Sequence, residues 1–317
     1  MKVVVLAGGV GGARLAHGFY QALEPENLTV IVNTGDDFDH IGLRICPDLD
    51  TVTYTLAGIA NRETGWGIAA ETFEVLAALE RVGGPSWFRL GDRDLATHLQ
   101  RTALLSSGLR LTEVTSRICA ALGVKARVLP MTDDTVATTI RTTEGELDFQ
   151  DYFVRRRCEP VVQSIRFAGI EAALPSPEVS EAISEADGIV IAPSNPFVSI
   201  EPILALPGVR ELVQSRPAVA VSPIVGGRAI KGPAAKMLLE LGLEVSAAGV
   251  AKRYAGVIGG FILDQQDGSL AREVAGEGLE AVVTQTIMRS DGERESLAVS
   301  CLELLGRVAP TRGRVSH

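Results

Sequence analysis

The stretch VVVLAGGVGGARLAHGFYQALEPENLTVIV, residues 3–32, decides the fold class. It opens with an apolar run, passes through a glycine-rich turn, and continues with a pattern that predicts a helix over 13–23. A second apolar run follows at 28–32. Two short apolar strands joined by a helix are typical of a parallel pair, so this stretch predicts an α/β protein.

The same alternation of strand and helix patterns runs along most of the chain. Apolar runs typical of buried strands recur in ARVLP, DGIVIAPSNP, PAVAVSPIVGG, VIGGFILD and LEAVVTQT. Apolar spacing close to the 3.6-residue period predicts a largely helical region from about residue 50 to residue 123. The sequence therefore predicts a Rossmann-like, doubly wound fold around a mostly parallel sheet.

Residues 135–167 depart from this rhythm. The alternating segments ATTIRTTEGELDF and VVQSIRF predict antiparallel strands on either side of a Glu-Gly turn. We therefore expect a small inserted antiparallel subdomain at about 133–175, within a single Rossmann-like α/β domain that spans 1–306. The basic, turn-rich end RVAPTRGRVSH predicts a flexible tail over 307–317.

The composition argues against several classes of protein. The net charge is −9, whereas a general nucleic-acid binder needs a broad basic face, so no nucleic-acid partner is expected. The chain starts directly with a strand pattern and has no apolar run near the length of a membrane span, which predicts a cytoplasmic protein without a membrane partner. Four scattered cysteines without a CxxC pair favour neither a zinc ribbon nor a disulfide framework.

The glycine-rich turn is a candidate phosphate-binding loop. Gly8, Gly9, Gly11 and Gly12 allow close approach of a ligand to the backbone and to the first N–H groups of the following helix. The loop is not a dinucleotide fingerprint, because Arg14 fills the third glycine position, and no Gly-Lys-Ser/Thr follows as in a Walker A loop. A tight structural connection is the alternative interpretation.

Aspartates crowd the segment NTGDDFDHIGLRICPDLDT, residues 33–51, directly after the second apolar run. Because ligands of open parallel sheets bind at the carboxyl ends of the strands, this segment and the glycine loop are expected at one crevice. Two or more carboxylates beside a phosphate-binding turn suit Mg²⁺. A solvated acidic loop and the ribose-binding acid of an NAD site are the alternatives. The aspartates are Asp36, Asp37, Asp39, Asp48 and Asp50.

Other segments carry ligand-compatible side chains. In FRLGDRDLATH, residues 88–98, Arg89 or Arg93 is a candidate to grip an anionic or polar substrate group, with helix capping and surface ion pairs as the ordinary alternative. IAPSNPFVSI places Ser194 and Asn195 directly after a strand. SPIVGGRAIKGPAAK adds glycines and basic residues after another strand.

The motifs GGVGGAR, NTGDDFDHIGLRICPDLDTVTYTL, GWG, LGDRDLATH, LPMTDD, FQDYFV, APSNPFVSI and SPIVGG, in this order, resemble the 2-phospho-L-lactate transferase family of coenzyme F420 biosynthesis. Its actinobacterial members are phosphoenolpyruvate transferases. The resemblance covers residues 2–305. It implies a Mg²⁺-dependent transfer of a lactyl- or enolpyruvyl-bearing phosphate from a guanosine diphosphate-activated donor to the deazaflavin Fo, with release of GMP. GGVGGAR and GDD look closer to the bacterial members, which favours the enolpyruvyl donor.

The same resemblance implies roles for individual residues. Asp50 and Arg89 occupy positions associated with Fo, whereas Asp36 and Asp50 occupy those associated with the metal and hence with catalysis. The glycine loop, together with Ser194 and Asn195, borders the nucleotide and its phosphates. A homodimer is also expected from the resemblance.

Two other functions stay open at this point. Gluconeogenesis-factor proteins share a related glycine loop and fold, so a nucleotide-sugar-binding regulator without turnover is one alternative. The motifs PDLDT and LGDRD, which look fitted to the deazaflavin site, count against it. An NAD(P)-dependent oxidoreductase is the other alternative, and Arg14 in the place of the last fingerprint glycine counts against that.

Overall fold

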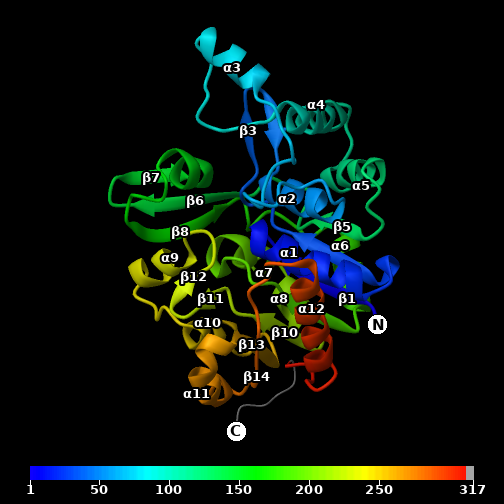
Figure 1. Ribbon diagram of the computed structural model, residues 1–317, viewed down its shortest axis with the longest axis vertical. Helices are drawn as coiled ribbons and strands as arrows, with labels where there is room; N and C mark the ends of the chain where they lie inside the picture. Colours follow the sequence, from blue (N-terminus) through cyan, green and yellow to red (C-terminus); the bar gives the residue numbers. More distant parts are fainter. Residues whose placement is uncertain (312–317) are drawn as a thin grey trace.

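Seven parallel strands form the central sheet of the protein, which a computed structural model describes over residues 1–311 (Figure 1). The strands follow the order β14-β13-β10-β9-β1-β2-β5, and every neighbouring pair is parallel. The chain fills one half of the sheet outward from β1 and then the other half outward from β9, which is the Rossmann order with one additional strand. The strands are β1 (Val3–Ala7), β2 (Leu28–Val32), β5 (Arg127–Pro130), β9 (Gly188–Ile191), β10 (Ala218–Val221), β13 (Gly260–Asp264) and β14 (Glu280–Thr284).

Helices cover both faces of this sheet, which confirms the predicted doubly wound fold. Successive side chains of a strand point to opposite faces, so Val3 and Val5 of β1 pack into one core cluster and Val4 and Leu6 into another. The first cluster lies under α1 (Gly9–Ala22), α2 (Pro47–Leu56), α5 (Leu111–Ala121) and α12 (Asp291–Leu305). The second lies under α6 (Pro177–Glu185), α7 (Glu201–Leu204), α8 (Val209–Gln214), α9 (Ala234–Glu240), α10 (Ala247–Tyr254) and α11 (Ala271–Gly276).

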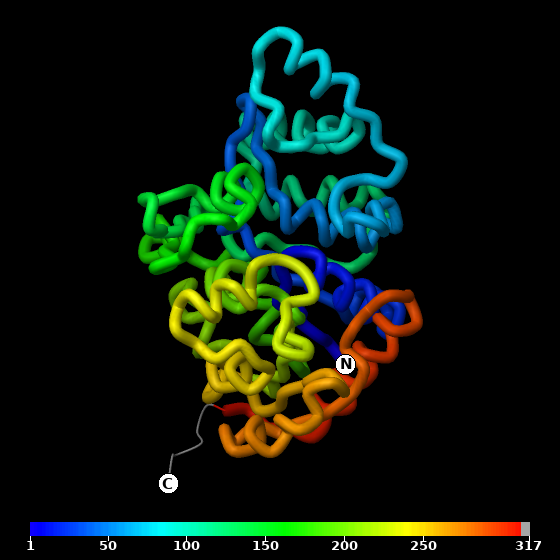
Figure 2. Tube along the Cα trace, turned by 60° about the vertical axis from the view of Figure 1, so that its left-hand side comes forward, coloured from blue at the N-terminus to red at the C-terminus, as the bar shows by residue number. Residues whose placement is uncertain are grey.

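The predicted helical region lies at one end of the molecule. Besides α2 and α5 it contains α3 (Glu74–Arg81) and α4 (Asp92–Ser106), which lie farthest from α11 (Figures 1 and 2). The acidic segment before it is more than a loop, because it forms a hairpin of β3 (Phe38–His40) and β4 (Leu43–Ile45). The hairpin turn holds Ile41 and Gly42 at φ values of 54° and 74°, the backbone that a tight two-residue turn requires.

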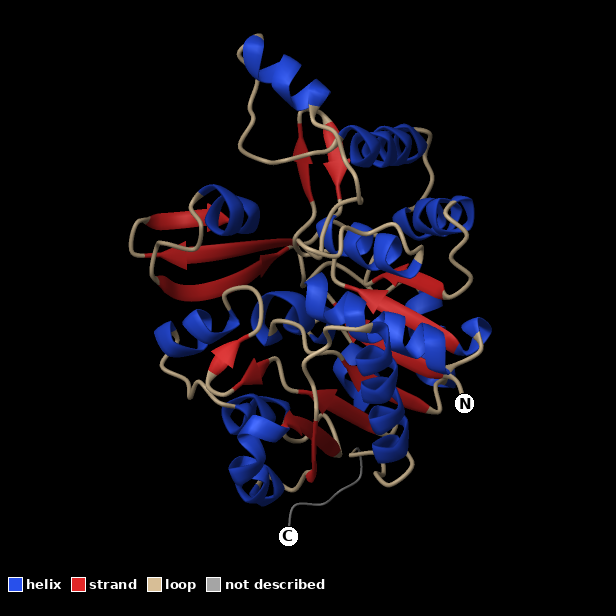
Figure 3. Ribbon diagram, viewed as in Figure 1, coloured by secondary structure: helices blue, strands red, loops and turns tan. Residues whose placement is uncertain are grey.

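A three-stranded antiparallel sheet lies beside the central sheet (Figure 3). It consists of β6 (Ala137–Thr142), β7 (Gly145–Asp148) and β8 (Val162–Ala168), and it falls inside the segment 133–175 predicted from the alternating pattern. A shorter antiparallel pair, β11 (Ile224–Val225) and β12 (Arg228–Ala229), encloses two glycines with positive φ. The strand-end segment SPIVGGRA is therefore a hairpin.

The end of the chain is described as far as residue 311. After α12 the side chain of Val308 packs against the core, where a Cβ on Gly259 would lie 3.0 Å from it. Residues 312–317, the last part of the predicted tail, lie outside the described residues. Within 1–311, no helix combines the length and the apolar character needed to cross a membrane.

Candidate active site

The glycine loop and the loop after β9 meet where the strand order reverses. The hydroxyl of Ser194 accepts a hydrogen bond from the Gly8 N–H at 3.1 Å and donates one to the Gly8 carbonyl at 2.8 Å. A Cβ on Gly11 would lie 2.3 Å from the carbonyl oxygen of Pro193, so only glycine lets the two loops approach this closely. The structure thus brings two of the predicted ligand-binding segments together at the crevice where sheets of this order bind ligands.

Helix α1 begins at Gly9, four residues earlier than the sequence pattern predicts. Gly9 adopts a φ of 62°, and its N–H donates a hydrogen bond to Oδ1 of Asp48 at 2.7 Å. The helix dipole favours a carboxylate in this place. Because Ser194 and Asp48 take the N–H groups of Gly8 and Gly9, these two groups organise the loop itself rather than stand open for a phosphate.

Asp48 is a site residue that sequence reasoning did not select. It is buried at the start of α2, where its Oδ2 also accepts a hydrogen bond from the Asn33 side-chain amide at 3.0 Å. Asp48 and Asp50 are two positions apart, roughly 200° around a helix, so they point in opposite directions. Pro47 at the first helical position is the signal that places both aspartates on a helix and shows that only one can face the glycine loop.

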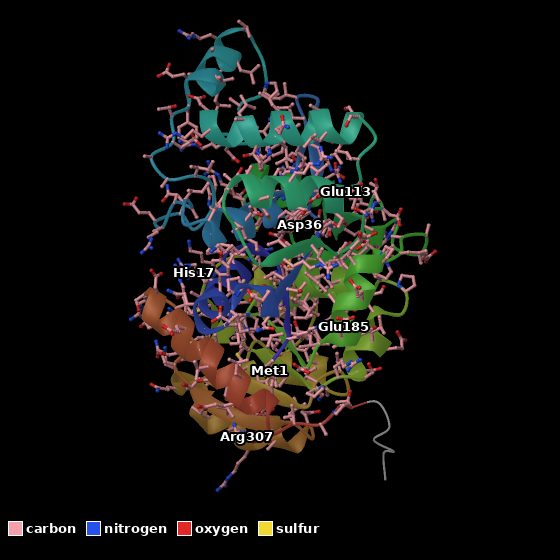
Figure 4. All side chains as sticks on the ribbon, turned by 90° about the vertical axis from the view of Figure 1, so that its right-hand side faces the viewer. Met1, His17, Asp36, Glu113, Glu185 and Arg307 are labelled. Carbon is pink, nitrogen blue, oxygen red and sulfur yellow. The ribbon has the colours of Figure 1, made fainter. Side chains whose placement is uncertain are left out.

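Asp36 lies beside Asp48. Figure 4 labels Asp36 near the middle of the molecule. It is 7% exposed, and its Oδ1 has no hydrogen-bond partner among the described residues. Burial, and then the neighbouring charge of Asp48, raises the pKa of Asp36 well above its ordinary value, and burial also raises the pKa of Asp48. Two adjacent buried carboxylates with an unsatisfied oxygen are a donor set that fits a hard divalent cation such as Mg²⁺.

Asp50 faces a different set of partners from Asp36. Both terminal nitrogens of the buried Arg101 donate hydrogen bonds to its carboxylate, one of them at 3.0 Å from Oδ2. Nδ1 of His98 lies 3.7 Å from the same oxygen. The predicted metal pair of Asp36 and Asp50 is therefore divided in the structure. Asp36 lies beside Asp48 at the glycine loop, whereas Asp50 already has a permanent cation as its partner.

His98 links Asp50 to Asp94. Nε2 of His98 lies 3.2 Å from Oδ1 of Asp94, and that oxygen accepts a hydrogen bond from the Tyr54 hydroxyl at 2.7 Å. Although burial opposes it, the neighbouring His98, the hydrogen bond from Tyr54 and the charge of Arg101 lower the pKa of Asp94. Ligand atoms of the three residues lie within 4.8 Å of one another, a spacing that suits a metal. The guanidinium of Arg101 would repel a second cation there, so the pair at the glycine loop fits better.

Asp37 lies next to Asp50 and Arg101. Neither of its carboxylate oxygens has a hydrogen-bond partner among the described residues, and the guanidinium of Arg44 is 3.8 Å from Oδ2. Burial raises the pKa of Asp37 to about 7, although Arg44 acts in the opposite direction. Near neutral pH this carboxyl group is therefore only partly ionised.

A cavity of about 300 Å³ opens between the segment 61–73 and the segment 89–94. The guanidinium carbon of Arg89 lies 4.3 Å from the centroid of the Phe73 ring, and Trp66 and Asp94 also line the cavity. A cationic plane stacked on an aromatic ring offers both a flat apolar contact and a charge. The cavity has the size and lining of a site for a small molecule with a ring.

A sequence model of the family described as 2-phospho-L-lactate transferase CofD matches residues 3–301. The chain belongs to this CofD family of transferases. It is 45% identical over 316 residues to a phosphoenolpyruvate transferase of Streptomyces griseus, covering 97% of this chain and 99% of that protein. It is also 40% identical over 298 residues to a 2-phospho-L-lactate transferase of Methanosarcina mazei, with coverages of 93% and 98%.

Solved structures of another protein have a fold similar to that of this transferase. Two crystal structures of a UPF0052-family protein from Bacillus halodurans superpose with TM-scores of 0.62 and 0.59, at 17% and 16% identity. They cover 95% of this chain and 99% and 98% of those chains. This likeness concerns the fold alone. Membership of the transferase family favours an enzyme over the regulator and the oxidoreductase that the sequence left open.

Among the predicted substrate-binding residues of the transferase, Arg89 lines the cavity and the others lie outside it. Arg93 is exposed, and its guanidinium donates to the Ala69 carbonyl at 3.3 Å, with no place in the cavity lining. The side-chain oxygen of Asn195 accepts a hydrogen bond from the Phe197 N–H at 2.9 Å and so caps the turn that follows β9. Asn195 thus shapes the loop that carries Ser194.

The contact between the two loops leads to a prediction about stability. We expect Gly11→Ala to destabilise the transferase by about 1–3 kcal/mol, because the new methyl group must push the Pro193 carbonyl away. Gly292→Ala is the matched control, since Gly292 lies in an exposed helical turn and a Cβ there meets nothing within 4 Å. Chemical denaturation measures both. Equal stability of the two variants would contradict the close packing.

Proposed function

We propose that this transferase moves a phosphoenolpyruvyl or 2-phospho-L-lactyl group from a guanosine diphosphate-activated donor to the deazaflavin Fo. A hydroxyl oxygen of Fo attacks the phosphorus that carries the three-carbon group, and the bond from that phosphorus to the bridging oxygen breaks. GMP leaves with the bridging oxygen, and the hydroxyl proton is released. The product is the phosphodiester of dehydro-coenzyme F420-0 or of coenzyme F420-0. Family membership and the names of the relatives support this reaction.

The observation that carries the proposal is the pair of buried carboxylates beside the glycine loop. Asp36 and Asp48 would hold Mg²⁺, in place of the Asp36 and Asp50 pair that the resemblance implies. Bound there, the ion would supply Lewis acidity and neutralise charge on the phosphates. Asp48 also holds the N-terminus of α1, so the same side chain would fix the ion relative to the crevice.

Asp50 has a different place in this proposal. It does not line the cavity, whereas Asp94 does, and His98 connects the two carboxylates. We therefore assign Asp50 a positioning role. Through His98 and Arg101 it would hold Asp94 at the cavity wall, where the acceptor binds.

Arg89 gives a prediction for the acceptor. Arg89→Ala removes the stacked guanidinium from the cavity, so the apparent KM for Fo is expected to rise about tenfold while kcat changes little. Arg81→Ala, which removes an exposed arginine at the end of α3, is the control. Steady-state kinetics with varied Fo measure the effect. An unchanged KM for Fo would take Arg89 out of the acceptor site.

The proposed reaction is tested by one product assay. The protein is incubated with Fo, Mg²⁺ and each activated donor in turn, and the phosphodiester and GMP are identified by mass spectrometry. Equal amounts of both products are expected, with one donor preferred. Binding of the guanine nucleotide without formation of GMP would refute the reaction and favour the nucleotide-binding regulator.

The proposal includes a homodimer that works in the cytoplasm, as expected from the resemblance. Helix α3 and its C-cap residue offer an apolar surface for such contacts, since Val75 of the helix and the C-cap Val82 are 49% and 81% exposed. Light scattering of the purified protein measures the oligomeric state, and a monomer at all concentrations would remove the dimer from the proposal.

A further inference from the structure

A second, smaller pocket lies next to the ring-sized cavity, and Asn61 lines both. Its volume is about 30 Å³, enough for two or three water-sized groups and hence for a carboxylate or phosphate group rather than a nucleobase. Its walls come from α1, from the end of α2 and the loop that follows it, and from α12. The basic residues among its lining are Arg14, His17, Arg62 and Arg294.

Positive charge dominates this pocket. Asp291 pairs with Arg62 at 3.2 Å and with Arg294 at 3.1 Å, and the guanidinium of Arg14 donates to a backbone carbonyl. Burial lowers the pKa of Arg294. The charge of Asp291 acts in the opposite direction, and the charges of Arg14 and Arg62 lower the pKa further. The Nε of Arg294 is buried without a hydrogen-bond partner among the described residues. Three permanent cations thus share one carboxylate, in a chain whose net charge is −9.

Lys231 extends the cationic pocket to the glycine loop. Its ammonium group donates a hydrogen bond to the Thr64 carbonyl at 2.5 Å. A Cβ on Gly65 would lie 3.2 Å from that ammonium group and 2.6 Å from a methyl group of Val10. Val10 directly follows Gly9, and Arg14 lies one helical turn further along α1. The cations therefore form a track from the glycine loop to the pocket.

The pocket and Asp48 lie along the same face of α2. Thr55 lines the pocket and lies seven positions after Asp48 on α2, which places the two side chains on the same helix face about 10 Å apart. Helix α1 packs along this face, and His17 of the pocket lies on α1 (Figure 4). A single nucleotide-sized molecule can span this distance.

We propose that the cationic pocket of Arg14, Arg62 and Arg294, with Lys231 beside it, is a subsite for an oxyanion of the donor. The oxyanion is either a phosphate or the carboxylate of the three-carbon group. The inference rests on the proposed function, because only a transferase of this kind has a donor with both groups. Since the N–H groups of Gly8 and Gly9 are already taken, the donor's negative charge requires side-chain cations in addition to a metal.

The test uses Arg62 of the pocket and Lys231 beside it. Arg62→Gln and Lys231→Gln are combined, since the Arg62 side chain is 75% exposed and Lys231 is also exposed, so that the fold is preserved. The control combines Arg117→Gln and Lys125→Gln, which removes the same charge from exposed sites near β5. Isothermal titration measures the Kd of GDP with Mg²⁺, and phosphoenolpyruvate is tested as a competitor.

We expect the pocket variant, and not the control, to lose about tenfold in anion binding, the loss expected for removing one good charge-assisted contact. A weaker Kd for GDP identifies phosphate as the oxyanion. An unchanged Kd for GDP with weaker competition by phosphoenolpyruvate identifies the carboxylate. If the Kd for GDP and the competition by phosphoenolpyruvate are both the same in the pocket variant and in the control, the inference is overturned. Wild-type protein that binds GDP through these cations but forms no phosphodiester would overturn the proposed function and leave this subsite standing.

Discussion

Asp48→Asn is expected to lower kcat by about 100- to 1,000-fold, equivalent to roughly 3–4 kcal/mol of transition-state stabilisation. The substitution keeps the shape of the side chain and an oxygen for the Gly9 N–H. It removes one of the two charges that would hold Mg²⁺. Steady-state kinetics at varied Mg²⁺ measure the loss. A wild-type rate with the usual Mg²⁺ requirement would remove Asp48 from the metal site.

Stability gives a second readout for Asp48→Asn that does not depend on turnover. The folded-state pKa values of Asp36 and Asp48 are raised, so the folded protein holds more protons than the unfolded chain. Stability is therefore lost as the pH rises from about 4 through these raised values. The variant should gain stability over metal-free wild type across this range, because one of the two repelling charges is gone.

Added Mg²⁺ should reverse that order. An ion that binds only the folded state stabilises wild type, and the variant should respond much less. Asp39→Asn is the matched control, since Asp39 belongs to the same acidic segment but its side chain is 75% exposed. It should behave as wild type in turnover and in its response to Mg²⁺. Equal stabilisation of wild type and Asp48→Asn by Mg²⁺ would contradict the proposed site.

Arg101→Met is expected to destabilise the protein by about 3–5 kcal/mol, because it leaves the buried carboxylate of Asp50 without its cation. Arg101 is 2% exposed, so water cannot replace the lost partner. Arg117→Met, at an exposed position of α5, should change stability by no more than about 0.5 kcal/mol. Chemical denaturation monitored by circular dichroism measures both variants.

The double variant Asp50→Asn/Arg101→Met separates charge from packing. Removing both members of the pair should recover about 2–3 kcal/mol of the loss, because no unpaired charge remains. The recovered protein then shows whether the pair of Asp50 and Arg101 is needed for turnover, and a rate well below that of wild type is expected from the positioning role proposed for Asp50. If the double variant lost as much stability as the two single variants added together, the two residues would not act as a pair.

Local patterns in the sequence determined the architecture of this protein. Apolar strand runs, each followed by a helix pattern, are enough to predict a doubly wound parallel sheet, because strand and helix periods are properties of neighbouring residues. The meeting of the glycine loop and Ser194 also follows from sequence, since both end a strand and the ligand crevice lies at strand ends. The antiparallel strands within 133–175 follow from alternation in the same way.

The tertiary structure alone decided which charges meet. The sequence shows five aspartates in one segment but does not say that Asp48 turns to the glycine loop while Asp50 turns to Arg101, 51 residues later. Nor does it show that Arg14, Arg62 and Arg294 line one pocket. The physical reason is that charge pairing depends on the rotation and packing of whole helices against one another, and no short stretch of chain contains that information.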